Sequence, residues 1–283
     1  MNYLNNDTFT GERAKFHSSD LVIDRCVFED GESPLKESKN LVIHDTEFRW
    51  KYPLWYCENV KCFNVTFTNT ARSGVWYTNN IDFVDSNIIA PKTFRRCEGV
   101  RITNTKIPHA DETLWKCKKV VINQIEATGD YFGFNSEDIE VSFLTLHGNY
   151  CFDGGKNIVI QNSTLYSKDS FWNCENVTII NSVIIGEYLG WNTKNLTLIN
   201  CKIISHQGLC YIKGLKMVNC QIIDSDLCFE FCEDIDADIT NEVDSIKNPI
   251  SGVIRTKGVK ELIRDASLID PKKTEIFVGY EKI

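Results

Sequence analysis

The chain has 283 residues, of which 42% are hydrophobic and 25% are charged, and its formal net charge is -8. This length is enough to bury a hydrophobic core in one large domain or two small ones. Acidic residues number 39 and basic residues 31. Proteins that bind nucleic acids concentrate basic residues on one surface, so the charge balance predicts no nucleic-acid partner.

No apolar stretch approaches the roughly 18 to 20 residues that a membrane span requires. The first seven residues lack the basic start and apolar middle of a secretion signal. We therefore expect a cytoplasmic protein without membrane association. Twelve cysteines are present, but a disulfide framework is typical of short secreted chains, so we expect reduced thiols.

Neither the cysteines nor the five histidines form a recognisable metal-binding pattern. No C-x-x-C pair occurs, and the histidines lie too far apart in the repeat to share one ion. No glycine-rich phosphate loop is present either. The sequence therefore predicts neither a metal site nor a cofactor.

Residues 1–17 precede a repeat that fills residues 18–240, and they are predicted to form an N-terminal cap. In the repeat, Asn, Asp or Gly is followed by alternating apolar residues and then by Asn or Asp, as in residues 176–181. The first apolar residue recurs every 19 to 21 positions. These twelve anchors are Leu21, Leu41, Val60, Ile81, Val100, Val120, Ile139, Ile158, Val177, Leu196, Leu215 and Ile235.

Apolar residues in each repeat keep a period of two, which is the period of a β-strand. Asn, Asp and Gly flank each strand and tolerate left-handed backbone angles, so they indicate corners. A third strand follows a variable connection, as at residues 54–56 and 75–77. The pattern predicts an all-β fold, a right-handed parallel β-helix of about 12 coils with three parallel sheets and capped ends.

A leucine-rich-repeat solenoid is the alternative fold, but no Leu-x-x-Leu-x-Leu phrase supports it. Residues 241–283 lie outside the repeat and are predicted to cap the C-terminal end, because open solenoid ends expose unpaired strand edges. Within them, we expect a short helix at residues 257–264 and a strand at residues 275–279. The whole chain is interpreted as a single domain.

The third strand carries an aromatic ladder with five of the six tryptophans. Such rings could form a surface on which sugars stack, or they could form a buried aromatic column. The small residues two positions further on appear in the inward-facing set, which favours burial. The ladder consists of Trp55, Trp76, Trp115, Phe134, Phe152, Trp172 and Trp191.

A polar ladder lies immediately before the third strand. It is basic in early coils, where Arg95 adds charge, and acidic in later coils. Stacked carboxylates would lie near the roughly 5 to 5.5 Å separation of retaining glycosidases. A corner column of solvated charges is the favoured explanation of the pattern. The ladder consists of Arg72, Lys92, Glu112, Asp130, Asn149, Asp169, Glu187, Gln207 and Asp226.

The phrases at residues 31–36, 52–56, 91–95, 168–172 and 207–211 resemble those of an uncharacterised bacterial β-helix family, a domain of unknown function. The repeat as a whole resembles the pectin-lyase-like superfamily of right-handed parallel β-helices. The resemblance covers roughly residues 7–265 and implies the fold. It supplies no activity and no catalytic residue.

Two functions remain open. The first is a binding or scaffold protein that presents its third-strand face to a glycan-like ligand or a protein partner, through Arg72, Lys92, Arg95, Trp76, Trp115 and Trp172. The alternative is a polysaccharide lyase or glycoside hydrolase acting on intracellular oligosaccharides. Its acid and base groups would come from Glu112, Asp130, Asp169 and Glu187. The oligomeric state is not predicted.

Overall fold

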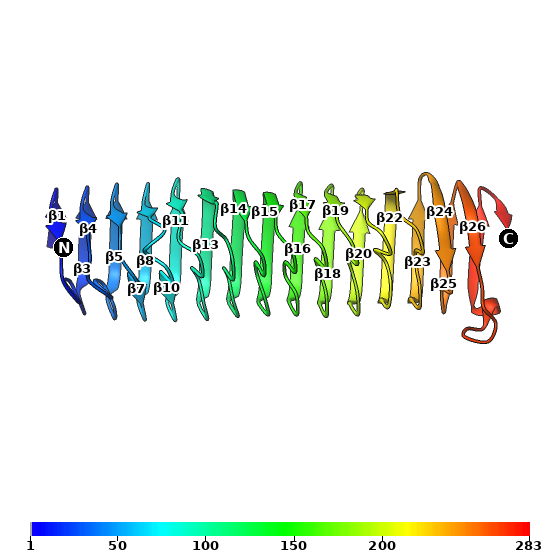
Figure 1. Ribbon diagram of the computed structural model, residues 1–283, viewed down its shortest axis with the longest axis horizontal. Helices are drawn as coiled ribbons and strands as arrows, with labels where there is room; N and C mark the ends of the chain where they lie inside the picture. Colours follow the sequence, from blue (N-terminus) through cyan, green and yellow to red (C-terminus); the bar gives the residue numbers. More distant parts are fainter. Residues whose placement is uncertain (1) are drawn as a thin grey trace. The chain divides into compact units, whose positions relative to one another are not determined.

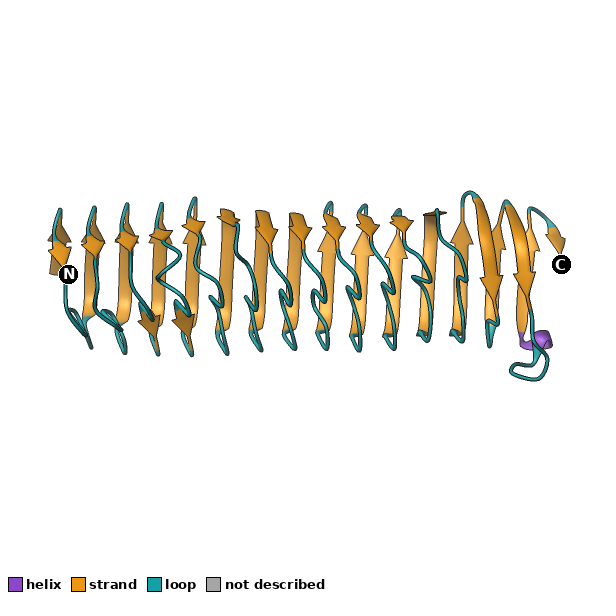
Figure 2. Cartoon of the chain, viewed as in Figure 1, coloured by secondary structure: helices purple, strands orange, loops and turns teal. Residues whose placement is uncertain are grey.

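The computed structural model describes residues 2–283, which form strands connected by turns (Figures 1 and 2). The chain divides into two compact units, unit 1 (Met1–Leu146) and unit 2 (His147–Ile283). One 3-10 turn, η1 (Pro271–Lys273), is the sole helical element in residues 2–283. Within those residues, no helix has the length and apolar character needed to span a membrane.

Unit 1 is a stack of coils whose long strands pair in parallel, with equivalent anchors such as Leu21 and Leu41 in register. The long strands are β1 (Asn2–Asn5), β3 (Ser19–Asp24), β5 (Lys39–His44), β8 (Glu58–Phe63), β11 (Asn79–Val84), β13 (Glu98–Ile107), β14 (Lys118–Thr128) and β15 (Glu137–His147). Shorter strands follow a sharp corner in the first coils: β2 (Thr8–Phe9), β4 (Val27–Phe28), β6 (Glu47–Phe48), β9 (Thr66–Phe67) and β12 (Asn87–Ile88). The third side has β7 (Leu54–Trp55) and β10 (Val75–Trp76).

Unit 2 has the same organisation, with Val177 and Leu196 among its paired anchors. Its first strands are β16 (Lys156–Gln161), β18 (Glu175–Ile180), β20 (Lys194–Ile199), β22 (Lys213–Ile223), β23 (Glu233–Ile239), β25 (Gly252–Thr256) and β27 (Thr274–Val278). Its second strands are β17 (Thr164–Tyr166), β19 (Val183–Ile185) and β21 (Lys202–Ile204). The remaining strands are β24 (Glu242–Lys247), β26 (Gly258–Ile263) and β28 (Glu281–Lys282).

The predicted parallel β-helix is confirmed, with more coils than the 12 that the repeat indicates. Eight first strands in unit 1 and seven in unit 2 make about 15 coils in residues 2–283. The segments expected to be caps continue the stack, because Asn2 pairs with Leu21, and Gly252 pairs with Ile235. The predicted strand near residue 275 is confirmed as β27.

The helix predicted at residues 257–264 is wrong. These residues form β26, which pairs in parallel with β24 from Glu242 to Lys247. Pairing with the preceding coil satisfies the backbone groups that a helix would otherwise satisfy internally. The right-handed sense of the coil stays a prediction.

In most coils a single left-handed residue forms the corner that follows the anchor segment, either after the long strand or within a longer strand such as β13. In unit 1, Asn64 and Asn104 adopt φ values of 52° and 46° there. Their side-chain amides donate to Asp45 and Asp85 of the preceding coils, at 2.6 and 2.5 Å. Asn and Asp tolerate this backbone geometry and bond along the stack, so the corner predicted from the sequence is stabilised twice.

A column of Cys, Ser and Thr lines the inside of the third corner. The Thr78 hydroxyl donates to the Leu54 carbonyl at 2.7 Å and accepts the Cys57 N–H at 3.1 Å. Cys57 likewise donates its thiol to the Leu35 carbonyl at 3.1 Å. Burial raises the pKa of Cys57 to about 12, so the thiol stays protonated and able to donate. All twelve cysteines are free and buried.

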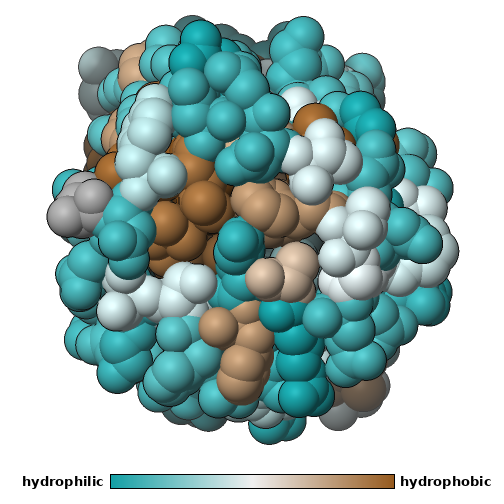
Figure 3. All heavy atoms as spheres, turned by 90° about the vertical axis from the view of Figure 1, so that its left-hand side faces the viewer, coloured by the Kyte–Doolittle hydropathy of each residue, from teal (hydrophilic) through white to brown (hydrophobic). Residues whose placement is uncertain are grey.

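At the N-terminal end of unit 1, apolar atoms lie at the centre of a polar rim (Figure 3). Tyr3 and Phe16 in this first coil are 58% and 38% exposed. Further along the unit, the equivalent interior is closed by neighbouring coils, and Phe28 and Phe48 stack at 4.8 Å. The core is therefore a set of columns that run along the stack.

Candidate functional site

The third side of each coil begins at a left-handed corner residue and reaches a ladder residue three positions later. We call this surface the third face. Backbone hydrogen bonds set its register, such as Lys92 N to Asp111 O at 2.9 Å and Asp169 N to Glu187 O at 2.8 Å. The corner residues are Arg13, Ser33, Tyr52, Ser73, Lys92, Glu112 and Tyr131 in unit 1 and Tyr150, Asp169, Tyr188, Gln207 and Leu227 in unit 2.

The polar ladder expected from the sequence is two adjacent columns. Lys92, Glu112 and Asp169 occupy the left-handed corner, whereas the other charged members precede it by one residue. The preceding column contains Arg72, Asp130, Asn149, Glu187 and Asp226. Counting back from the next anchor separates the two columns, because the corner residue lies eight positions before the anchor and the preceding residue nine. The prediction merged these two counts.

The expectation that the tryptophan ladder is buried is wrong. Trp172 is 37% exposed, and Trp55, Trp76, Trp115 and Trp191 are half-buried. The inward position belongs to the preceding residue. It is occupied by fully buried Leu54, Val75, Phe94, Phe152 and Phe171.

The period of two fails here because the residue after the ladder position is left-handed, as Tyr56 is with φ 56°. That turn places Trp55 and Cys57 on different sides of the chain. The true ladder is Phe16, Lys36, Trp55, Trp76, Arg95, Trp115 and Phe134 in unit 1 and Asp153, Trp172, Trp191, Cys210 and Glu230 in unit 2.

In unit 1, the ladder is an aromatic–arginine stack. The rings of Trp55 and Trp76 stack nearly parallel, with their centroids 5.0 Å apart. The Arg95 guanidinium lies 4.6 Å from the Trp76 ring centroid and 5.0 Å from the Trp115 ring centroid. The indole N–H groups of Trp55 and Trp76 donate to the carbonyls of Ser73 and Lys92, at 2.6 and 2.9 Å. The faces between consecutive members are covered, so the rings present mainly their edges to solvent.

The basic residues beside this stack are paired. Glu112 accepts from Lys92 at 2.9 Å and from Arg95 at 2.8 Å. Burial opposes ionisation of Glu112, but the bonds and charges of Lys92 and Arg95 outweigh it, so the pKa of this carboxyl is lowered. Arg72 is exposed in another coil. Lys92 and Arg95 are thus neutralised within the protein, which disfavours their predicted role in holding an anionic sugar.

Unit 2 differs because Asp153 takes the ladder position next to Trp172. The Trp172 ring makes no ring stack, cation contact or indole hydrogen bond with the residues that the structure describes. Trp191, one coil later, stacks on Tyr211 at 4.9 Å. Trp172 is therefore the ladder tryptophan with the most ring surface available to a ligand.

Asp169 is the corner residue that begins the Trp172 coil, three positions before the ring. Asp169 is 6% exposed, and its carboxylate makes no hydrogen bond or ion pair within residues 2–283. Burial raises the pKa of Asp169. The positive charge of Lys168 opposes this shift, and the negative charges of Asp153 and Glu187 add to it. Asp169 is absent from the buried side-chain atoms that lack a partner, so its carboxylate oxygens reach solvent and are open to a hydrogen-bond donor from a ligand.

Asp153 has a similar environment. Burial raises its pKa, opposed by the Asn173 amide, whose Nδ2 lies 3.5 Å from the Asp153 carboxylate. Asn173 also accepts from Asn192 at 2.7 Å. We call Asp153, Asp169, Trp172 and Asn173 the aspartate–tryptophan site. It combines an exposed ring with acceptors and an amide, the groups that bind hydroxyls.

Of the ligand-binding residues predicted from the sequence, Trp76 and Trp115 enclose Arg95 in unit 1, and Trp172 belongs to the aspartate–tryptophan site. Among the predicted carboxylates, Asp169 lies in that site, and Glu187 lies in the next coil, 3.7 Å from Lys168. Asp130 directly precedes the corner residue Tyr131, and its backbone carbonyl accepts the Glu112 N–H at 2.9 Å. The sequence interpretation missed Asp153. Counting five residues back from the anchor Ile158 would have found it, because every ladder residue precedes its next anchor by five.

Residues 2–283 contain no group of three or more His, Cys, Asp or Glu side chains arranged to hold a metal ion. The side chains of the aspartate–tryptophan site offer ring stacking, hydrogen bonding to the carboxylates and proton transfer.

A sequence model of the family described as "Protein of unknown function (DUF3737)" matches residues 2–277. The search of curated proteins finds no match. Among solved structures, the Streptococcus pneumoniae surface protein and adhesin PfbA is 9% identical, with a TM-score of 0.42 and coverage of 76% of each chain.

The Azotobacter vinelandii mannuronan C-5 epimerase AlgE4 A-module is 12% identical, with a TM-score of 0.42. The alignment covers 84% of this chain and 87% of that one. A tailspike protein of E. coli bacteriophage HK620, solved with a pentasaccharide, is 8% identical, with a TM-score of 0.35 and coverage of 97% and 72%. Similarities this distant carry no argument about activity.

Proposed function

We propose that this chain, which belongs to the family described as protein of unknown function (DUF3737), binds a saccharide at the aspartate–tryptophan site. The observation that carries the proposal is the 37% exposed Trp172 ring, with Asp153 at the neighbouring ladder position and Asp169 at the corner of the same coil as Trp172. A sugar has an apolar C–H face and a rim of hydroxyls. The ring would pack against that face while Asp153, Asp169 and Asn173 bond the hydroxyls.

The charge of the site favours a neutral or amine-bearing saccharide. Asp153, Asp169 and Glu187 interact with one another unfavourably when all are ionised. A uronate would add another negative charge, whereas hydroxyl donors or an ammonium group would compensate those present. This preference replaces the anionic sugar expected from the basic residues of unit 1.

Hydrolysis of a glycosidic bond is a second candidate function, favoured by the raised pKa of Asp169. A raised pKa increases the protonated fraction of a carboxyl at a given pH, and the protonated form can donate a proton to the leaving-group oxygen. Asp153 would then act as the base or nucleophile. The enzymatic proposal requires both residues, whereas binding requires chiefly Trp172 and one acceptor.

The experiment is a panel of neutral, amine-bearing and uronate oligosaccharides tested by calorimetric titration and for released reducing ends. We expect neutral or amine-bearing members to bind, and Trp172→Ala to weaken binding at least tenfold, or about 1.4 kcal/mol. Trp50→Ala is the control, because Trp50 lies outside the ladder. Binding that survives Trp172→Ala unchanged would exclude this site. Turnover lost in Asp169→Asn, with binding retained, would favour hydrolysis.

A further inference from the structure

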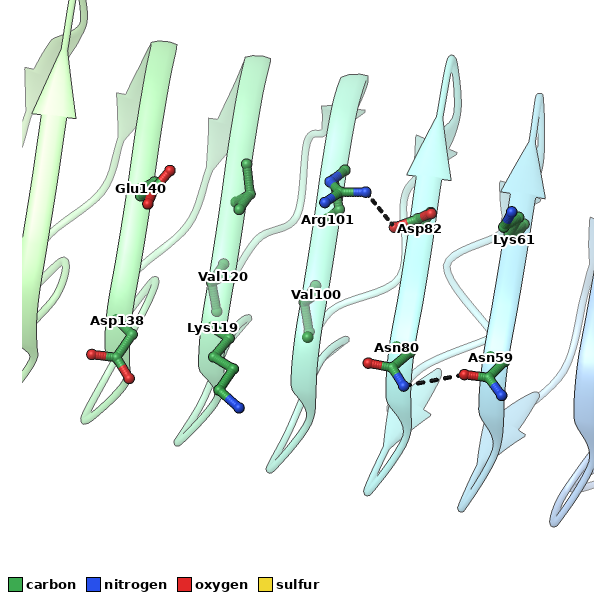
Figure 4. A pocket seen from close by; sticks show the side chains of 12 residues that line it. Asn59, Lys61, Asn80, Asp82, Val100, Arg101, Lys119, Val120, Asp138 and Glu140 are labelled. Carbon is green, nitrogen blue, oxygen red and sulfur yellow. Dashed lines mark hydrogen bonds and ion pairs between the residues drawn. The ribbon is translucent and has the colours of Figure 1, made fainter.

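The outer face of the long strands in unit 1 contains a separate groove. It extends over β8, β11, β13, β14 and β15, as Figure 4 shows, with a volume of about 480 Å³. This volume lies within the range of about 300 to 1,000 Å³ that small-molecule sites occupy. Two rows of side chains form its rims: Asn59, Asn80, Lys119 and Asp138 on one side and Lys61, Asp82, Arg101, Val121 and Glu140 on the other.

The groove opens where a ladder of amides stops. Asn59 donates to Asn40, and Asn80 donates to Asn59, each at 3.1 Å. The next position is Gly99, whose φ of 72° resembles the left-handed angles of the asparagines. A Cβ at Gly99 would lie 2.8 Å from the Asn80 Oδ1 atom. The missing side chain leaves one edge of the Asn80 amide uncovered and exposes the backbone floor.

The rims carry three cationic and three anionic side chains, so their formal charges cancel. The Arg101 Nη1 and Asp82 Oδ1 atoms are 3.6 Å apart, a distance longer than that of a good hydrogen bond. Lys61 and Glu140 make no hydrogen bond or ion pair with the described part of the chain. Donors and acceptors therefore face the same cavity without a net charge that would select an ion.

A hydroxyl group both donates and accepts, so a polyhydroxylated ligand satisfies both kinds of rim residue. Half-buried Val121 adds apolar surface between the polar groups. The rows repeat at the roughly 4.8 Å spacing of neighbouring strands, which suits an extended ligand. We infer that this groove binds a neutral oligosaccharide through Asn80, Arg101 and Glu140.

This site shares no residue with the aspartate–tryptophan site, so it goes beyond the proposed function and does not depend on it. Gly99→Asn should extend the amide ladder with a residue that tolerates positive φ and should fill the groove. Gly214→Asn is the matched control in unit 2. Gly214 has φ 76°, follows Asn195 in its ladder and would place a Cβ 2.8 Å from Asn195 Oδ1.

The measurement is saturation-transfer-difference NMR with maltohexaose, xylohexaose and mannohexaose in a Trp172→Ala background. We expect transfer to at least one sugar, retained with Gly214→Asn and lost with Gly99→Asn. Absence of transfer to all three sugars, or transfer that Gly99→Asn leaves intact, would overturn the inference. Binding that disappears with Trp172→Ala alone would also overturn it while supporting the proposed function.

If Gly99→Asn fails to fold, Arg101→Gln and Glu140→Gln replace it, since both side chains are exposed. Each should weaken binding about tenfold. Lys216→Gln, an exposed residue in unit 2, is the control. Unchanged binding in both groove variants would contradict the inference.

Discussion

The Arg95 guanidinium donates a 2.8 Å hydrogen bond to the carboxylate of Glu112, the corner residue of the next coil in unit 1. Asp153 and Asp169 occupy the corresponding ladder and corner positions in unit 2, where both residues are acidic. The same backbone geometry thus holds a compensated pair in unit 1 and an uncompensated pair in unit 2. This contrast distinguishes a stabilising contact from a candidate binding site.

Arg95→Ala should lower the free energy of unfolding by about 2 kcal/mol, because it removes two cation–π contacts and leaves Glu112 less compensated. Arg101→Ala on the exposed long-strand face should change it by less than about 0.5 kcal/mol. Urea unfolding at neutral pH measures both. Equal effects would show that the aromatic–arginine stack does not stabilise unit 1.

The contribution of Glu112 should depend on pH. Its pKa is lowered in the folded protein, so its pairing stabilises above the unfolded pKa and is lost as pH falls through the folded value. Glu112→Gln should therefore be less stable than the wild type at neutral pH, with the difference shrinking below about pH 4. Thermal unfolding across this range is the test, and a difference that grows on acidification would have the wrong sign.

Ser136→Ala should cost about 2 kcal/mol. The Ser136 hydroxyl donates to the Leu114 carbonyl at 2.6 Å and accepts the Cys117 N–H at 2.8 Å, and both buried groups would lose a partner. Ser136→Cys should cost less, because cysteine serves this column elsewhere. Ser19→Ala, at an exposed position, is the control. Equal stability of the Ala and Cys variants would contradict the assigned hydrogen-bonding role.

Asn181→Leu should destabilise unit 2 by about 2 kcal/mol more than Asn181→Gly. Asn181 has φ 50° and accepts from Asn200 at 3.0 Å. Both substitutions remove the amide, but only leucine incurs the cost of a left-handed backbone. Chemical unfolding of the two variants isolates that cost. A leucine variant as stable as the glycine variant would argue against a strained corner.

The long strands could be predicted because their period of two and their Asn or Asp corners both have clear sequence signals. Leu21 and Leu41 pair as that pattern requires. The third face could not be predicted in the same way. Its left-handed residues include Tyr56 and Arg96, residue types that rarely mark a corner, so alternation assigned Trp55 to the wrong side. The groove also depends on five coils together, which no single repeat reveals.

Asp169→Asn should be more stable than the wild type at neutral pH, and this difference should shrink at acidic pH. The pKa of Asp169 is raised in the folded state, so its neutral form stabilises below the unfolded pKa, and this stability is lost as pH rises through the folded value. The stabilisation by asparagine should therefore disappear below about pH 4. Melting of both proteins across this range measures it. A variant less stable than wild type at neutral pH would show that the ionised carboxylate has a favourable partner.

Oxidative footprinting of tryptophan tests the saccharide-binding proposal most directly. Each indole is modified with N-bromosuccinimide and quantified by mass spectrometry, with and without the best-binding oligosaccharide of the panel. We predict that the ligand lowers the oxidation rate of Trp172 at least about threefold, which corresponds to a free-energy difference of about 0.65 kcal/mol. The oxidation rate of Trp50 should stay unchanged. Equal oxidation of Trp172 in the free and ligand-saturated protein would contradict the account.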